Sequence, residues 1–254
     1  MRVCYWDKEL SCFAGKETAV TIGSFDGMHK GHRVLIDTLT RICAEKNYQS
    51  VVFTFTRPLP AIKHAGDYAG DICSLSQRLA LFEQLHIDTL ILVDFDEKFA
   101  TVSGTDFLLQ LAERINMRCL VEGFDFHCGY KGKTTRTEIE RWAKGSQVET
   151  HFLEPVYYTA ADGKRERVSS SFIRRMILNG NFSAAAELLG HPYELDIEEI
   201  RRVSAAGLPV TQLLPPDGVY CAFSETDSTI MLEVKNGTIA DLPDCRRVRF
   251  NVKN

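Results

Sequence analysis

The sequence lacks long apolar runs, blocks of basic residues and paired cysteines. No stretch approaches the roughly 20 apolar residues that a membrane-spanning helix needs, and charges at positions 2, 7 and 8 leave no apolar core for a signal peptide. The formal net charge is −4 and lysine and arginine nowhere form a stripe, which argues against nucleic acid as a partner. The eight cysteines include no CxxC pair, so neither a disulfide framework nor a zinc knuckle is expected. We therefore expect a cytoplasmic protein with reduced thiols and no nucleic-acid or membrane partner, whose oligomeric state is left open.

The sequence does contain a regular alternation of short apolar strands and amphipathic helices. Apolar runs predict strands at 18–22, 51–55, 90–93, 119–121 and 148–153, and apolar residues at helical spacing predict helices near 35–43, 79–85, 107–115 and 139–143. Strands that are apolar on both faces and separated by helices are typical of a parallel sheet with helices on each side. Ligands bind beyond the carboxyl ends of such strands, so we expect the site in the loops after Ile22, Phe55 and Val121.

The pattern changes after about residue 190. Prolines become frequent, and Asn236-Gly237 between two short apolar runs predicts a hairpin with a type I′ turn. We therefore expect residues 1–186 to form the α/β domain and residues 187–254 to form a smaller β-rich module.

The strongest functional signal is the string GSFDGMHKGH at residues 23–32, between the first strand and the first helix. Its glycines allow tight turns and a close approach of the backbone to a ligand. The helix that follows offers unpaired N–H groups and a positive dipole end to an anion. His29 and His32 can both donate hydrogen bonds to phosphate oxygens and stabilise charge on a phosphorus under attack. Either histidine alone would more often be a surface or capping residue, and HxxH without further ligands is weak evidence for zinc.

The second signal is VSSSFIRR at residues 168–175, at the start of another predicted helix. Serines at such a position are as often simple helix caps as ligand-binding groups. Three serines together with Arg174 also make a second phosphate cradle, because a guanidinium is a planar and permanently charged donor. The chain thus offers two helix N-termini to one polyphosphate.

These two strings resemble the signatures of the nucleotidylyltransferase superfamily. More closely, the chain resembles the adenylyltransferase half of the prokaryotic bifunctional riboflavin kinase/FAD synthetases over about residues 15–195. The shared strings are GSFDGMHKGH, VVFTF at 51–55, FDEKFATVSGTDFL at 95–108, VEGFDFHCG at 121–129 and SSSFIRRMILNGNFSAAAELLGHPY at 169–193. The resemblance implies a Rossmann-like nucleotidylyltransferase fold and the transfer of AMP from ATP to FMN, which gives FAD and pyrophosphate. It also implies Mg²⁺ bound chiefly through substrate phosphates and water, as is usual for this ion.

The resemblance also implies roles for individual residues. It makes His29, His32 and Arg174 the catalytic groups. It places ATP against Gly23, Ser24, Phe25, Asp26, Gly31, Asp125, Ser169, Ser170 and Ser171, and the flavin near Phe55, Pro58, Pro60 and Phe126. No protein ligand for a metal is implied.

Several positions depart from the family pattern. The usual TFDPHP reads TFTRPLP at residues 54–60, Phe172 stands where an arginine is frequent, and Cys128 replaces a phenylalanine. In the tail, GLPVTQL at 207–213 resembles the GxPTAN motif of the kinase half, with Val210 and Gln212 at the positions that serve nucleotide and metal. We therefore expect residues 187–254 to be a truncated kinase-like module without kinase activity. Two alternatives stay open: another phosphorylated acceptor, such as pantetheine phosphate or nicotinamide mononucleotide, and a binding protein without turnover.

Overall fold

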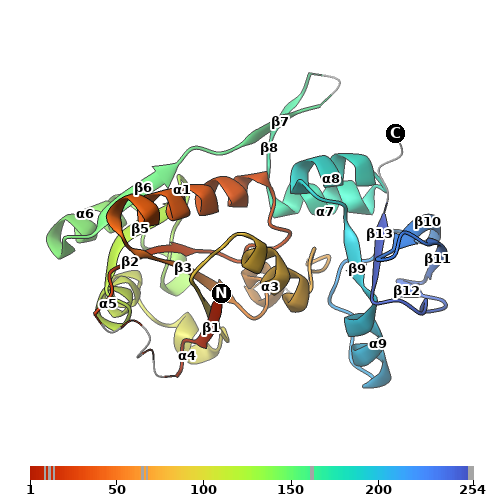
Figure 1. Cartoon of the computed structure of the whole chain (residues 1–254), viewed down its shortest axis with the longest axis horizontal. Coiled ribbons are helices and arrows are strands. Elements are labelled where there is room, and N and C mark those ends of the chain that lie inside the picture. The colour runs from red at the N-terminus through yellow and green to blue at the C-terminus, as the bar shows by residue number, and fades with distance from the viewer. Residues whose placement is uncertain are drawn as a thin grey trace. The chain divides into compact units, whose positions relative to one another are not determined.

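The computed structural model (Figure 1) describes residues 1–8, 10, 13, 15–63, 66, 68–160 and 163–250, and these form two compact units. The first, here called the parallel-sheet unit, contains residues 1–24, 32–62 and 82–155. The second, the antiparallel-sheet unit, contains residues 25–31, 63–81 and 156–250 of the described chain. The chain therefore passes from one unit to the other and back within the string at residues 23–32. The sequence boundary expected near residue 187 stays a prediction.

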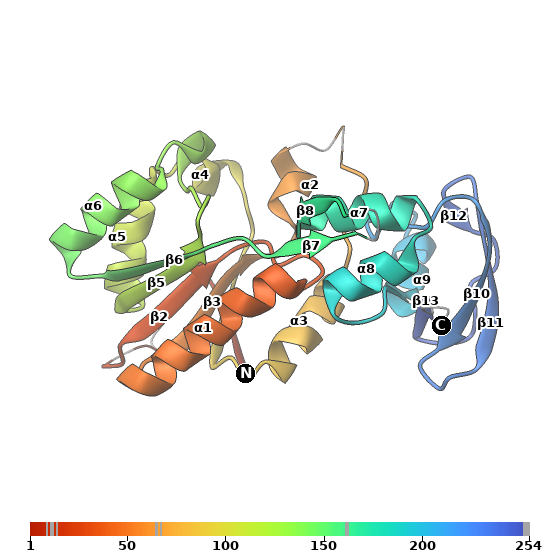
Figure 2. The ribbon, with the colours of Figure 1, turned by 90° about the horizontal axis from the view of Figure 1, so that it is seen from above.

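The parallel-sheet unit has the predicted α/β architecture. Its six strands lie in the order β1-β4-β3-β2-β5-β6 and all pair in parallel. Helix α1 covers one face of the sheet, and α5 and α6 cover the other (Figure 2). The elements are β1 (Arg2–Tyr5), β2 (Thr18–Ile22), α1 (Lys30–Lys46), β3 (Gln49–Phe55), α2 (Leu59–Lys63), β4 (Thr89–Val93), α4 (Glu97–Ala100), α5 (Gly104–Arg114), β5 (Met117–Gly123), the short helix η2 (Tyr130–Gly132), α6 (Arg136–Ser146) and β6 (Glu149–Leu153). Helix α3 (Leu75–Gln84) has its residues 75–81 in the antiparallel-sheet unit and its last three in this one.

The core of this unit explains why its strands read as continuous apolar runs. Every residue of β2 and β4 is buried, and the aromatic rings of Trp6, Phe53, Phe99 and Phe107 pack edge-on or stacked in one cluster. The end of β2 is held by a buried carboxylate, because Glu122 Oε1 accepts the Ile22 N–H at 2.6 Å. The first residue of the glycine- and histidine-containing string therefore follows a firmly fixed strand end.

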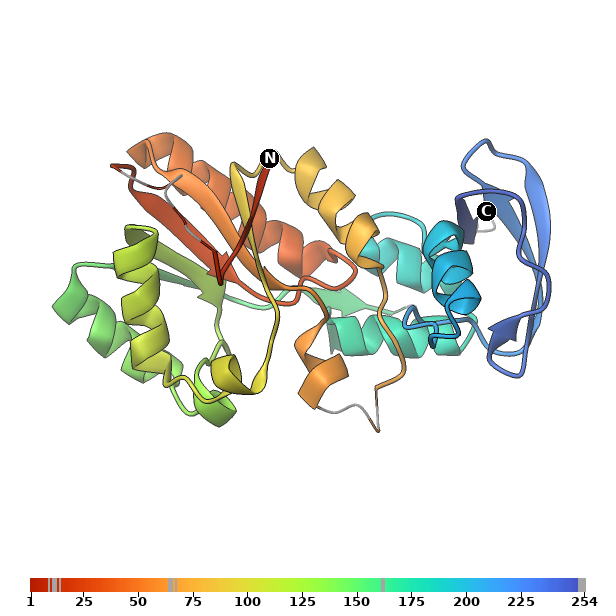
Figure 3. The same cartoon turned by 90° about the horizontal axis from the view of Figure 1, so that it is seen from below.

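The antiparallel-sheet unit contains the predicted β-rich module together with α7, α8, α9 and most of α3. Its sheet has the order β12-β11-β10-β13-β9, and α7, α8 and α9 lie on one side of it (Figures 1 and 3). The expected hairpin is present, with Asn236 and Gly237 at φ 53° and 67° in the turn between β11 and β12. The elements are β7 (Tyr157–Thr159), β8 (Arg165–Arg167), α7 (Ser170–Leu178), α8 (Phe182–Leu189), β9 (Glu194–Asp196), α9 (Ile197–Ala205), β10 (Gly218–Ser224), β11 (Thr229–Lys235), β12 (Thr238–Ile239) and β13 (Arg247–Phe250).

The structure also describes the cysteines and the helices that bear on a membrane location. The cysteines in the described part of the chain, which leaves out Cys12, are all free thiols. No helix among the described residues is both long enough and apolar enough to span a bilayer.

Candidate functional site

The carboxyl edge of the parallel sheet brings two of the expected loops together. Ser24, the residue after Gly23 at the end of β2, accepts the Leu59 N–H on its Oγ at 3.0 Å. Leu59 lies between Pro58 and Pro60, so the loop after β3 is tied directly to the loop after β2. The two loops therefore meet at the edge where sheets of this kind usually bind their ligands.

The string at residues 23–32 adopts a constrained backbone. Phe25 and Met28 have φ values of 48° and 41°, a region that residues other than glycine rarely occupy, and both side chains are fully buried. Gly27 has φ 83°, and a Cβ there would lie 2.9 Å from Leu189 and 3.0 Å from Ile72. The surrounding antiparallel-sheet unit thus holds this segment in one conformation, as strained functional loops require.

His29 is held in its neutral form. Its side chain is only 6% exposed, and burial lowers its pKa to about 4, with the charges of Arg167 and Arg174 acting in the same direction. A neutral imidazole still carries one N–H donor. A Cβ at Gly31 would lie 3.2 Å from the His29 ring, so glycine there leaves the ring its place at the start of α1.

A buried ion pair joins the two predicted phosphate-binding strings. Arg174 Nη2 binds Asp26 Oδ2, and the two residues are 8% and 1% exposed. Arg174 also donates from Nη2 to the Tyr68 hydroxyl at 2.7 Å and from Nε to the Gly70 carbonyl at 2.7 Å. Its guanidinium lies over the Tyr68 ring at 4.6 Å.

The Asp26 carboxylate is bound from a second side by backbone. It accepts the N–H groups of Ile72 and Cys73 at 3.0 Å each. Burial raises the pKa of Asp26, and the Arg174 charge and these two N–H donors oppose that rise. The resemblance assigned Asp26 to the ATP site, but its side chain is bonded to Arg174 and to the backbone of residues 72 and 73.

The serines of the second string occupy distinct places. Ser169 is the N-cap of α7 and its Oγ accepts the Phe172 N–H at 3.2 Å, so the capping interpretation is confirmed for this residue. Ser170 donates its hydroxyl to the Asp26 carbonyl at 2.9 Å, which makes a second link between the two strings. Ser171 is exposed at the start of the helix.

The remaining predicted residues belong to the parallel-sheet unit. His32 lies in the first turn of α1 and is half-buried. In the loop after β5, Asp125 is exposed and Phe126 packs partly against the core. Phe55 is only 4% exposed, with its ring against those of its neighbours Phe95 and Phe99. Pro58 is buried and Pro60 exposed.

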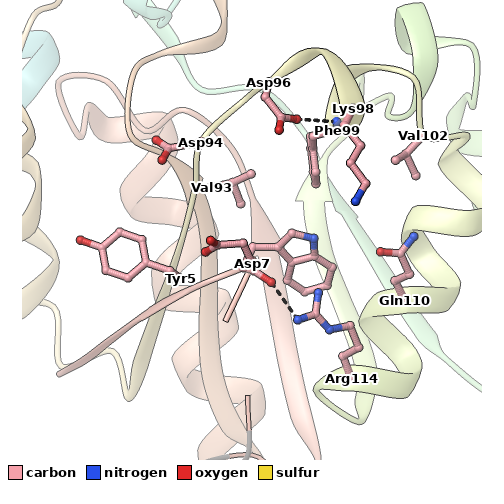
Figure 4. A pocket seen from close by; sticks show the side chains of 11 residues that line it. Tyr5, Asp7, Val93, Asp94, Asp96, Lys98, Phe99, Val102, Gln110 and Arg114 are labelled. Carbon is pink, nitrogen blue, oxygen red and sulfur yellow. Dashed lines mark hydrogen bonds between the residues drawn. The ribbon is translucent and has the colours of Figure 1, made fainter. Parts of the chain in front are cut away.

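A cavity of about 520 Å³ lies at the carboxyl ends of β1 and β4 (Figure 4). Its walls include Trp6, Phe99 and Gln110, and Arg114 stacks on the Trp6 indole at 4.0 Å while donating to the Trp6 carbonyl at 2.8 Å. Phe99 also contacts Phe55, so the cavity adjoins the aromatic residues expected near the flavin. This cavity was not predicted from the sequence, because the short, largely exposed strand β1 that forms part of it has no apolar run.

Sequence reasoning also missed several residues that bind or face the two strings. Tyr68, Gly70 and the backbone of residues 72–73 carry no local motif and reach Asp26 and Arg174 only through the fold. Arg167 directly precedes the second string, and its adjacency to those serines could have singled it out. Within the described ranges, no three His, Cys, Asp or Glu side chains are grouped to hold a metal ion.

Known proteins resemble this chain in sequence and fold. The family model described as FAD synthetase matches residues 14–172. The bifunctional riboflavin kinase/FMN adenylyltransferase of Bacillus subtilis is 32% identical over 232 residues, covering 87% of this chain and 70% of that protein. The FAD synthetase of Listeria monocytogenes is 25% identical over 224 residues, covering 88% of this chain and 87% of that protein. A Streptococcus pneumoniae structure described as a macrolide-efflux protein matches with a TM-score of 0.73 at 24% identity, over 100% of this chain and 86% of that chain, which concerns the fold alone.

The neutral state of His29 predicts a specific loss of stability in acid. The unfolded chain takes up a proton near pH 6.5, whereas the folded chain does so only near pH 4, so stability falls as the pH drops through this window. We expect a His29→Asn variant to lose less of its unfolding free energy than the wild type between pH 7 and pH 4, by roughly 3 kcal/mol. Urea unfolding at a series of pH values measures this difference. The variant His151→Asn, in the edge strand β6, is the control. Identical pH slopes for wild type and His29→Asn would contradict the assignment.

Proposed function

Because the chain belongs to the FAD synthetase family, we propose that it transfers AMP from ATP to FMN, giving FAD and pyrophosphate. The bond that forms joins an FMN phosphate oxygen to the α-phosphorus of ATP, and the bond that breaks joins the α-phosphorus to the bridging oxygen of pyrophosphate. The FMN phosphate is anionic near neutral pH, so the reaction needs no general base. The protein's task is to position two anions and to stabilise the charge that develops between them.

The observation that carries this proposal is that Asp26 of the first proposed phosphate-binding string is bonded to Arg174 and Ser170 of the second, all within the antiparallel-sheet unit. Asp26 accepts from Arg174 on its side chain and from Ser170 on its carbonyl, so the string at 23–32 and the start of α7 are fixed to each other. The N-terminus of α7 and the string that leads into α1 are both anion-binding elements. This arrangement supports the grip of one polyphosphate from two sides.

The catalytic roles follow from the state of each group. Neutral His29 donates an N–H to a phosphate oxygen without placing a fixed positive charge there, and His32 acts as a second donor from the first turn of α1. Arg174 contributes positive charge and, through Asp26, keeps the string in place. The ATP contacts proposed are Gly23, Ser24, Phe25, Gly31, Asp125, Ser169, Ser170 and Ser171, with Asp26 acting through its internal bonds.

The flavin side is assigned to the aromatic edge of the parallel sheet. We place the flavin near Phe55, Pro58, Pro60 and Phe126, at the loops after β3 and β5. The cavity beside Phe99 lies on the same edge and has the volume of a small-molecule site. It offers the space for the ring end of FMN, since Phe99 contacts both the cavity and Phe55.

Magnesium enters this account as part of the nucleotide substrate. The carboxylate closest in sequence to the histidines, Asp26, is buried and bound to Arg174 and two backbone N–H groups, so it is not presented to an ion in solution. Mg²⁺ would be held chiefly by phosphates and water, which is its usual mode of binding. Its contribution there is to neutralise phosphate charge.

Residues 187–254 are proposed to be a kinase-like module without riboflavin kinase activity. The Val210 side chain has no oxygen to offer a metal ion, and the Gln212 amide is buried and hydrogen-bonded to protein groups on both its oxygen and its nitrogen. Neither residue can therefore serve a nucleotide in this conformation. We assign residues 1–186 to the transferase and expect a cytoplasmic enzyme.

The direct test supplies purified protein with ATP, Mg²⁺ and FMN and separates the flavins by chromatography. We expect FAD and pyrophosphate in equal amounts. Pantetheine phosphate and nicotinamide mononucleotide, offered in place of FMN, should not be adenylylated.

Riboflavin in place of FMN is expected to give neither FMN nor FAD. Adenylylation of another acceptor without FAD formation would move the function to that acceptor. Failure with every acceptor would leave a nucleotide- or flavin-binding protein.

A second prediction concerns the two histidines. Removing one preorganised donor to developing charge costs on the order of 10²-fold in kcat. We therefore expect His29→Ala and His32→Ala each to lower kcat by about this factor while the KM for ATP changes much less. Steady-state kinetics measure the two parameters, with His151→Ala in β6 as a control that keeps wild-type rates. A rise in KM alone would mean that the histidines bind ground-state ATP and not the transition state.

A further inference from the structure

The antiparallel-sheet unit contains a buried glutamine whose side chain is fully used by the protein. Gln212 is 6% exposed, and its Oε1 accepts the Asp196 N–H at 2.8 Å. Its Nε2 donates to the carbonyls of Glu194 at 2.8 Å and Ile72 at 3.1 Å and to Gln77 Oε1 at 3.0 Å. A side-chain amide suits this place, because its oxygen accepts on one side while the two hydrogens of its NH2 group are shared among the three acceptors on the other.

Gln212 lies beside the backbone segment that holds the ion pair. Residues 211–213 run parallel to Asp71, with the Asp71 N–H bound to the Thr211 carbonyl and the Leu213 N–H bound to the Asp71 carbonyl, both at 2.8 Å. The approach is so close that a Cβ at Gly70 would lie 2.8 Å from the Leu213 Cα. The segment 70–73 is therefore clamped from this side by the tail of the chain.

On its other side, the segment 70–73 binds one residue of each of the two proposed phosphate-binding strings. Gly70 accepts from Arg174 Nε through its carbonyl, and Ile72 and Cys73 donate their N–H groups to Asp26. One peptide segment thus carries two sets of contacts. Gln212 donates a hydrogen bond to the Ile72 carbonyl, and the Ile72 N–H donates to the Asp26 carboxylate.

We propose that Gln212 is a positioning residue for adenylyl transfer, which fixes residues 70–73 so that they hold Asp26 and Arg174. This inference rests on the proposed function, and it gives the residues after 187 a purpose. Gln212 stands where the kinase motif has its asparagine, and in this chain it supports the proposed transferase site instead. Gln212 supports the site through hydrogen bonds to three residues that belong to neither of the two strings: Ile72, Gln77 and Glu194.

The test replaces Gln212 with methionine, which keeps the length and volume of the side chain and removes its hydrogen bonds. We expect kcat for FAD formation to fall about tenfold or more, with the KM values for ATP and FMN within about twofold of wild type, because the ground-state contacts to substrate are intact. Amide exchange followed by mass spectrometry should show faster exchange in peptides that contain Ile72 and Cys73. Gln212→Glu, which keeps the acceptor for the Asp196 N–H, is the second variant if the first does not fold.

Leu232→Ala is the matched control, because Leu232 is buried in β11 of the same unit and touches none of these groups through hydrogen bonds. At temperatures where both variants are folded, we expect Leu232→Ala to keep the wild-type kcat, even if its melting temperature falls as much as that of Gln212→Met. Equal kcat in Gln212→Met and the control, or unchanged exchange at residues 72–73, would overturn the proposal. If the wild type forms no FAD, the proposed function fails, and the exchange experiment still decides whether Gln212 fixes the segment.

Discussion

The candidate site depends on one buried ion pair, between Asp26 and Arg174. Charges are costly to bury, and such a pair is stable only when further hydrogen bonds satisfy both partners. Here Ile72 and Cys73 bind the carboxylate, while Gly70 and Tyr68 bind the guanidinium. Because Asp26 belongs to the first of the two proposed phosphate-binding strings and Arg174 to the second, the pair ties together the two segments that are proposed to bind ATP.

The same buried environment sets the state of the donors. Burial and two nearby guanidinium groups keep His29 neutral, so this proposed phosphate donor does not change its charge near neutral pH. An enzyme that joins two phosphorylated substrates gains most from groups that need no rearrangement during the reaction. The constrained backbone at Phe25 and Met28 serves the same end, since it is maintained by the folded unit around it.

The sequence predicted the α/β fold and the two strings because each carries a local signal. Apolar runs predicted strands such as β2 and β4, whose residues are all buried, and Asn236-Gly237 predicted the hairpin turn. Strand β1 was missed because it is short and largely exposed, so it has no apolar run. Tyr68 and Gln212 were not assigned to the site because they reach it through pairings between distant segments, which no local spacing reveals.

A double-mutant cycle on Asp26 and Arg174 tests the central claim most directly. Breaking one partner of a buried pair costs roughly 3–5 kcal/mol, whereas removing both leaves no unpaired charge. We predict that Asp26→Asn and Arg174→Met each lower the unfolding free energy by about that amount and that the double variant loses far less than their sum. All three should form FAD at rates reduced by about 10²-fold, because the two strings are no longer fixed to each other. Additive losses of stability, or wild-type rates in any of the three, would contradict the account.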